Sequence, residues 1–128
     1  MSISTEPAPR SALPFALGEY ERRWAAVREA AERDGLAGVV VFSRGGGQTD
    51  SYSDVLYLAN HYVAFPLLAD QVPHWSGHSH CALVFGPDGE PTLVHGFGEY
   101  RQELVAVEDV RVSPDVPDGV RAVLDEKG

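Results

Sequence analysis

The sequence predicts an α/β fold, a three-layer α/β/α sandwich with a mixed sheet. Three observations lead to this prediction. An amphipathic helix is followed at once by an uninterrupted apolar run at residues 38–42, and a β-hairpin follows at residues 79–95. Residues 109–112 have the composition of a further strand, and residues 117–127 that of a further helix. Elements that alternate in this way bury their apolar sides against one another in layers.

The first helix, predicted from residue 19 to residue 34, is indicated by the spacing of its apolar residues. They recur at steps of four, three and four: Tyr20, Trp24, Val27 and Ala31. This spacing forms one face of an α-helix of about four turns. Gly35 is expected to end the helix, because a left-handed residue is needed there and glycine adopts that conformation without strain.

Residues 38–42 form a β-branched run in which apolar and polar residues do not alternate. A strand that is covered on both faces, as in the centre of an α/β sheet, has this pattern. The glycine-rich residues 43–51 then predict a surface loop. These residues lack the spacing and the lysine of a phosphate-binding loop, so we do not expect them to bind phosphate. Asp54 is expected to cap one helical turn over residues 55–58.

The predicted hairpin pairs residues 79–85 with residues 90–95. Pro87, Asp88 and Gly89 lie between them and supply the restrained φ, the carboxylate and the positive φ of a tight turn. Residues 60–79 show no periodicity and are expected to be irregular.

The last third of the chain predicts three short elements. Residues 98–107 are expected to be helical, and residues 109–112 are expected to form a strand. Pro117 is expected to begin a final helix, since proline is tolerated in the first turn. Its inward side chains are predicted to be Val120, Val123 and Leu124.

The composition narrows the classes of partner. The chain has 128 residues, enough for a single domain, and a net charge of -9 without a basic cluster, which disfavours nucleic acid. No apolar run approaches the ~20 residues that cross a bilayer. The first dozen residues lack the apolar core of a signal peptide, so we expect a cytoplasmic protein with no membrane partner. Cys81 is the only cysteine and is expected to be a small buried side chain.

Four motifs follow one another in a fixed order. A helix ends in Gly35-Leu36 and leads into the strand Val39-Val40-Val41. Tyr57-Leu58-Ala59-Asn60 comes next, and the hairpin carries Ala82-Leu83-Val84 before its turn and Glu90-Pro91-Thr92-Leu93 after it. In this order the motifs resemble the N-terminal domain of the creatinase, prolidase and aminopeptidase P family, the pita-bread metallohydrolases.

The resemblance covers residues 17–128 and leaves residues 1–16 as a flexible N-terminal arm. The sequence departs from the family's pattern in two places. Asn60 stands where the family usually has glycine, and the loop at residues 44–53 is longer and richer in glycine. Prolidase, aminopeptidase P, creatinase and related carbon–sulfur lyases share this domain, so the subfamily stays open.

The resemblance implies the non-catalytic N-terminal domain of a hydrolase of the Xaa-Pro dipeptidase or aminopeptidase P type. In the family, a C-terminal domain binds divalent metal ions (Mn, Co or Zn; none in creatinase) through Asp, His and Glu side chains, and these activate a bridging water. That region lies beyond Gly128, so we expect no catalytic residue, metal ligand or cofactor in this chain. The expected partners are its own catalytic domain and a second copy in a homo-oligomer.

The resemblance also implies which residues lie near a substrate. In several members the segment after the Tyr-Leu motif reaches into the neighbouring subunit's active site and limits substrate size. By motif position that segment begins at His61 and Tyr62 and includes Phe65. Trp75 lies in the same irregular region, where aromatic side chains often line binding sites. The alternative is that Phe65 and Trp75 only pack beneath a long loop.

A second group of histidines has the spacing H-x3-H-x-H: His74, His78 and His80. Histidines at i and i+4 of a helix can share a zinc ion, but Pro73 disfavours a helix here, so we interpret them as loop or strand-edge residues. Ser76 lies near them without a nucleophile elbow, which argues against a serine hydrolase.

Two other functions stay open. One is a stand-alone α/β binding or interaction module, and the other is a creatinase-like or degenerate family member whose metal ligands are lost. The sequence that follows residue 128 in the gene distinguishes these alternatives.

Overall fold

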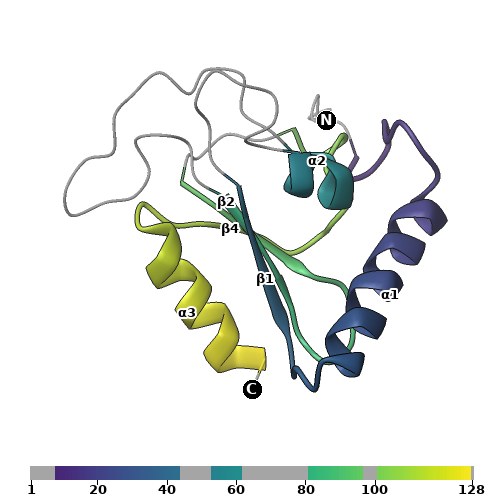
Figure 1. The fold of residues 1–128 in the computed structure, drawn as a ribbon. Helices are drawn as coiled ribbons and strands as arrows, with labels where there is room; N and C mark the ends of the chain where they lie inside the picture. Colours follow the sequence, from purple (N-terminus) through teal and green to yellow (C-terminus); the bar gives the residue numbers. More distant parts are fainter. Residues whose placement is uncertain (1–7, 44–52, 62–80, 97–100, 128) are drawn as a thin grey trace.

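The computed structural model describes residues 8–43, 53–61, 81–96 and 101–127 (Figure 1). This part contains three α-helices and four β-strands. Their bounds are α1 Leu17–Arg33, β1 Val39–Ser43, α2 Ser53–Ala59, β2 Cys81–Phe85, β3 Thr92–His95, β4 Val110–Val112 and α3 Val116–Lys127.

The four strands form one mixed sheet in the order β1-β2-β3-β4. β2 is antiparallel to both β1 and β3, whereas β4 is parallel to β3. The register places Ser43 beside Cys81, and Cys81 beside His95. The predicted α/β fold with a mixed sheet is therefore confirmed.

Helices pack on both faces of this sheet. Figure 1 shows α1 and α2 on one side of the strands and α3 on the other. The side chains of β2 alternate between the two faces: Leu83 and Phe85 belong to the core beneath α1 and α2, and Ala82 and Val84 to the core beneath α3. Because a strand presents successive residues to opposite faces, β2 contributes to both cores and is buried along its whole length.

Helix α1 forms as its spacing predicts. Tyr20, Trp24 and Ala31 are buried on its inner side. Gly35 follows the helix with a φ of +72°. Its N–H donates to the carbonyl of Glu32 at 3.1 Å, and the N–H of Leu36 donates to the carbonyl of Ala31 at 2.8 Å. These two bonds are those of a Schellman motif, so the predicted glycine cap is confirmed.

The predicted hairpin and the last helix are also present. Gly89 lies in the exposed turn between β2 and β3 with a φ of +76°. Helix α3 begins one residue before Pro117, and Asp115 caps it: its Oδ1 accepts the N–H of Asp118 at 3.0 Å. Carboxylates are favoured at this position because they satisfy a free N–H of the first turn.

The position predicted for β1 is wrong. Its apolar run predicted a central strand covered on both faces, but β1 is an end strand of the described sheet. The fully buried strands are β2 and β3, and Phe42 of β1 is 52% exposed. The composition of a strand reports how apolar its surroundings are and does not fix its order in the sheet.

Three local predictions are also wrong. Residues 101–107 form a turn followed by residues without regular secondary structure, rather than a helix, and Val105, Ala106 and Val107 are buried there in succession. Leu124, predicted to point inward, is 41% exposed. Asp54 lies inside α2, which begins at Ser53, and therefore does not cap it.

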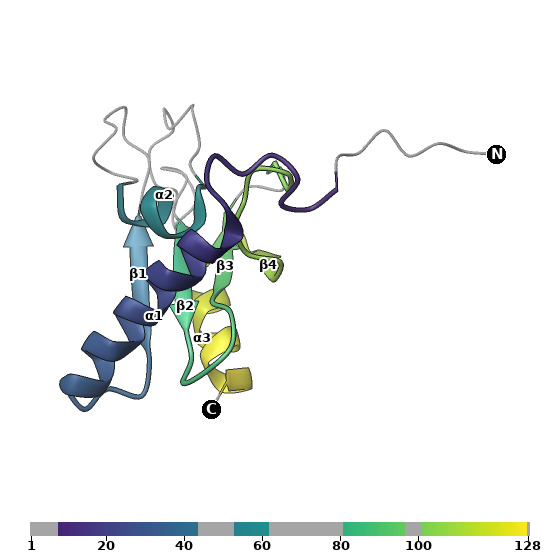
Figure 2. The same cartoon turned by 90° about the vertical axis from the view of Figure 1, so that its right-hand side faces the viewer.

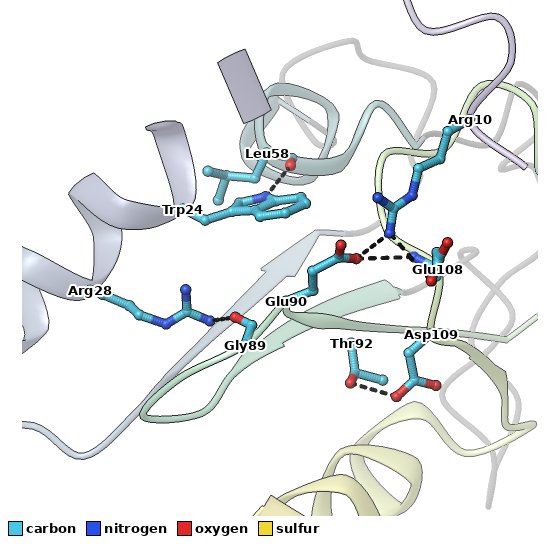
Figure 3. Close-up of polar contacts among 9 residues, drawn as sticks. All are labelled: Arg10, Trp24, Arg28, Leu58, Gly89, Glu90, Thr92, Glu108 and Asp109. Carbon is cyan, nitrogen blue, oxygen red and sulfur yellow. Dashed lines mark hydrogen bonds and ion pairs between the residues drawn. The ribbon is translucent and has the colours of Figure 1, made fainter. Parts of the chain in front are cut away.

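Residues that precede α1 contact the rest of the domain. The N–H of Arg10 donates to the carbonyl of Gln102, and the N–H of Ala12 to that of Glu103. The guanidinium of Arg10 forms ion pairs with Glu90 and Glu108 (Figure 3).

Within the described residues, none of the helices is both long and apolar enough to cross a membrane.

Candidate functional site

Four polar or reactive side chains lie at one end of the sheet. Ser43 ends β1, Cys81 begins β2 and His95 ends β3, and the three are register neighbours on the face covered by α1 and α2. His61 comes two residues after α2 and contacts the His95 ring. We call these four residues the histidine cluster.

The imidazole rings of His61 and His95 join two distant parts of the chain. Their centroids are 5.5 Å apart and their planes are inclined by 54°. His61 is 3% exposed and His95 1%. Within the described residues, Nε2 of His61 has no hydrogen-bond partner. A buried imidazole nitrogen in this position favours the neutral ring, because a charge there is poorly solvated.

The environment lowers the basicity of both histidines. Burial, with a smaller contribution from His95, lowers the pKa of His61 to about 4. Burial also lowers the pKa of His95. Both rings are therefore neutral at pH 7, and neither is a ready acceptor of a proton from a substrate.

Cys81 is not activated as a nucleophile. Burial raises the pKa of the Cys81 thiol to about 12, so the thiolate that attacks electrophiles does not form at neutral pH. The predicted small, buried Cys81 is confirmed. Oγ of Ser43 accepts the N–H of Val55 at 3.4 Å. In the described parts of the chain, no group of three or more His, Cys, Asp or Glu side chains is arranged to hold a metal ion.

The structure describes one of the four predicted substrate-proximal residues. His61 is buried against His95 within its own chain, and its predicted role at a neighbouring active site stays a prediction. Tyr62, Phe65 and Trp75 lie outside the described residues, as do the three histidines of the H-x3-H-x-H group. Sequence reasoning did not find His95, since a histidine at the end of an apolar strand gives no sign of which distant residue it contacts.

The Tyr-Leu motif of residues 57–60 is fixed by contacts from two directions. Nε1 of Trp24, on α1, donates to the carbonyl of Leu58 at 2.8 Å (Figure 3). On the other side, Nδ2 of Asn60 donates to the carbonyl of Leu104 at 2.7 Å. The N–H of Ala106 donates to the carbonyl of Ala59 at 2.9 Å. These three bonds satisfy polar groups at the end of a short helix that would otherwise be buried without partners.

Asn60 has an unusual backbone conformation. Its φ is +53°, in the left-handed region that few non-glycine residues occupy. Asparagine is among the residues that tolerate this region, because its short amide can hydrogen-bond locally. Asn60 therefore ends α2 in the conformation that a glycine would adopt without strain.

Tyr57, the first residue of the motif, and Phe15, which precedes α1, are exposed aromatic side chains. Phe15 is 54% exposed and Tyr57 52%. The guanidinium carbon of Arg23 lies 4.0 Å from the Tyr57 ring centroid and 5.1 Å from that of Phe15. Its Nη1 donates to the carbonyl of Tyr57 at 2.7 Å. Arg23 thus holds two half-exposed rings in a fixed arrangement, as cation–π contacts do.

Comparisons with known proteins give no family for this chain. No protein-family model, no curated protein and no solved structure matches it.

Proposed function

We propose that this chain is the non-catalytic N-terminal domain of a pita-bread metallohydrolase that acts on short peptides with proline as their second residue. Its role is to contact the catalytic domain and other copies of the protein and to limit the mouth of the active site. The metal ions and their ligands belong to the catalytic domain.

One observation carries this proposal: the conformation of Asn60. The Tyr57-Leu58-Ala59-Asn60 motif departs from the family's pattern at its last position, where glycine is usual. Asn60 has a φ of +53°, which glycine supplies most easily and asparagine second. The departure is therefore compatible with the same local backbone, which supports the resemblance at the point where the sequence weakens it.

The mutual packing of the four motifs gives further support. The first helix contacts the Tyr-Leu motif through Trp24 and the hairpin through Arg28, whose guanidinium donates to the carbonyl of Gly89 (Figure 3). The strand after this helix pairs with the hairpin from Val39 to Ser43. Segments that carry the resemblance are thus joined in space, as expected if they derive from one ancestral domain.

The experiment compares two proteins from the same gene. One is the 128-residue chain and the other is the product of the whole open reading frame, each assayed for hydrolysis of a Xaa-Pro dipeptide with added Mn²⁺. We expect activity in the longer protein alone. Hydrolysis by the purified 128-residue chain contradicts the non-catalytic role. A reading frame that ends at codon 128 contradicts the proposal as a whole and favours a stand-alone interaction module.

A further inference from the structure

The segment that precedes α1 is bonded to the rest of the domain through its backbone. The N–H of Arg10 donates to the carbonyl of Gln102 at 2.9 Å, and the N–H of Ala12 donates to the carbonyl of Glu103 at 2.8 Å. Figure 2 shows this segment running beside the chain that leads into β4. We call residues 8–13 the strap.

Arg10 has a backbone conformation that few side chains adopt. Its φ is +63°, in the left-handed region where Cβ crowds the following carbonyl. A residue other than glycine stays there only where the contacts around it outweigh the strain. The guanidinium supplies such contacts, because Glu90 and Glu108 both form ion pairs with its Nη2, and the Arg10 side chain is 14% exposed (Figure 3). These ion pairs therefore stabilise the strap in a conformation that is unfavourable by itself.

The residues that bind the strap are followed directly by residues that bind the end of α2. The carbonyl of Leu104 accepts Nδ2 of Asn60 at 2.7 Å, and the N–H of Ala106 donates to the carbonyl of Ala59 at 2.9 Å. One short segment, residues 102–106, is thus bonded to two parts of the chain that are far apart in the sequence.

This segment is bonded internally and packed in the core. The N–H groups of Leu104 and Val105 both donate to the carbonyl of Arg101, at 2.9 Å and 3.2 Å, and so form a tight turn. The side chains of Val105 and Ala106 are buried. Energetic coupling between distant groups is carried by such contiguous hydrogen bonds and packed side chains. A displacement of the strap is therefore expected to reach the end of α2.

We propose that the strap, held by the ion pairs of Arg10, controls how firmly the end of α2 is held. With the strap in place, residues 102–106 satisfy the polar groups of residues 59 and 60. Release of the strap loosens residues 102–106 and, with them, the end of α2. The inference rests on the proposed function in one respect: His61, the first residue of the predicted substrate-proximal segment, follows directly, so the strap sets the order of the active-site mouth.

Arg10 is the residue whose loss releases the strap most effectively. The strap also has an apolar contact, since Leu13 is partly buried against the core beneath α1 and α2. Removal of the guanidinium, however, has two consequences. It abolishes both ion pairs, and it leaves the carboxylates of Glu90 and Glu108 near one another without the cation that separates them.

The test is hydrogen exchange at single amides of the 128-residue chain, followed by NMR. The N–H of Ala106 reports on the coupling, because its partner Ala59 belongs to α2 and not to the strap. Arg10→Ala should accelerate exchange at Ala106 at least about tenfold, the factor by which the loss of a charge-assisted contact shifts a local opening equilibrium. The amides that join β2 to β3 should exchange as before, which shows that the variant is folded.

Two further variants sharpen the comparison. Glu90→Gln removes one of the two carboxylate charges and should accelerate exchange at Ala106 less than Arg10→Ala does. Arg111→Ala is the matched control, because Arg111 also pairs with two carboxylates, those of Asp109 and Glu126, which lie outside the strap and α2. Its exchange at Ala106 should equal that of the original chain.

Three results overturn the inference. Unchanged exchange at Ala106 in Arg10→Ala would show that the strap is attached to residues 102–103 without holding α2. Equal acceleration at Ala106 and in the amides between β2 and β3 would report a general loss of stability. An Arg111→Ala variant with the same acceleration at Ala106 would show that the effect is not specific to the strap. None of these measurements concerns peptide hydrolysis by the longer protein, so the two proposals fail separately.

Discussion

The two faces of the sheet are held to their helices by different means. The face beneath α1 and α2 contains large aromatic rings and buried polar groups, among them Trp24, His61 and His95. The apolar cluster beneath α3 is made of small aliphatic side chains: Ala82, Val84, Val94, Val116, Val120 and Val123. The buried Thr92 lies on the same face, since it is the register partner of Val84, and its Oγ1 donates to Oδ2 of Asp109. Among the described residues of the first face, side-chain hydrogen bonds join α1 to α2 and α2 to β1. On the second face α3 packs through small apolar side chains, with one ion pair between Arg111 of β4 and Glu126 at its edge.

This difference indicates which elements are held in one position by directional contacts and which are held chiefly by packing. Buried polar groups must find their partners, so the bonds of Leu58 and Asn60 fix the end of α2. Small apolar residues impose no direction, and α3 leaves β1 partly uncovered on its side.

The largest expected effect comes from removing the ring that joins α1 to α2. Trp24→Ala leaves a cavity and deprives the carbonyl of Leu58 of its partner, so we expect a loss of about 3–5 kcal/mol in the free energy of unfolding. Urea unfolding followed by circular dichroism measures it. Leu124→Ala on the other face should cost well under half as much, because Leu124 is already partly exposed. Equal losses at the two positions contradict the contrast between the faces.

Substitutions of Asn60 should destabilise the domain less than Trp24→Ala does, and the glycine variant serves as the control for the alanine variant. Asn60→Gly keeps the left-handed conformation and loses one hydrogen bond to the carbonyl of Leu104, at a cost of about 1 kcal/mol. Asn60→Ala loses the same bond and adds the strain of a positive φ, so about 2 kcal/mol is expected. Thermal or urea unfolding of both variants separates the two contributions. A glycine variant that is no more stable than the alanine variant argues against the left-handed backbone.

The histidine cluster should make the stability of the domain depend on pH. The pKa of His61 is lowered to about 4 in the folded state, so its unfolded form binds a proton first as the pH falls. The stability contributed by the neutral ring is complete above about pH 6.5 and is lost between there and about pH 4.

Urea unfolding at pH 7.5 and pH 5.0 measures this loss, about 2 kcal/mol from His61 alone. His61→Leu should retain more of its stability at pH 5.0 than the original chain does. Carboxylates with lowered pKa values, such as Glu19, act mainly below this window, since hydrogen bonds from Arg22 and Arg23 lower the Glu19 pKa to about 2. A variant with an unchanged pH dependence would show that His61 is charged in the folded state.

Much of the fold could be predicted because its signals are local. The apolar spacing of α1, the glycine after it and the turn before Gly89 each depend on a few neighbouring residues, and each prediction is confirmed. The position of β1 in the sheet and the exposure of Leu124 depend on which elements pack beside them. No periodicity within the element contains that information, so these two predictions are wrong.

The candidate site was less predictable for the same reason. His61 and His95 are 34 positions apart and meet because α2 packs against β1 and β2, at the end of the sheet where β3 also ends. The hydrogen bond from Asn60 to Leu104 likewise joins residues far apart in the sequence, 44 positions from one another. The resemblance singled out residues 57–60, but the left-handed φ of Asn60 is a property of the folded chain that the sequence alone does not give.

The contrast between the two faces is tested most directly by one substitution made in a helix on each face. Gly119 of α3 lies close to the sheet: an added Cβ would be 2.7 Å from Cβ of Ser113 and 2.9 Å from Cγ1 of Val94. Gly18 of α1 has no atom within 4 Å of the same position. Alanine favours a helix over glycine by up to about 1 kcal/mol at either site.

The measurement is the urea unfolding free energy of Gly18→Ala and Gly119→Ala at neutral pH. We predict opposite signs: Gly18→Ala stabilises the domain by about 0.5 kcal/mol, and Gly119→Ala destabilises it by at least about 1 kcal/mol because α3 must move away from β3. A stabilising effect at both positions would contradict the close approach of α3, and with it the claim that the two faces are held by different means.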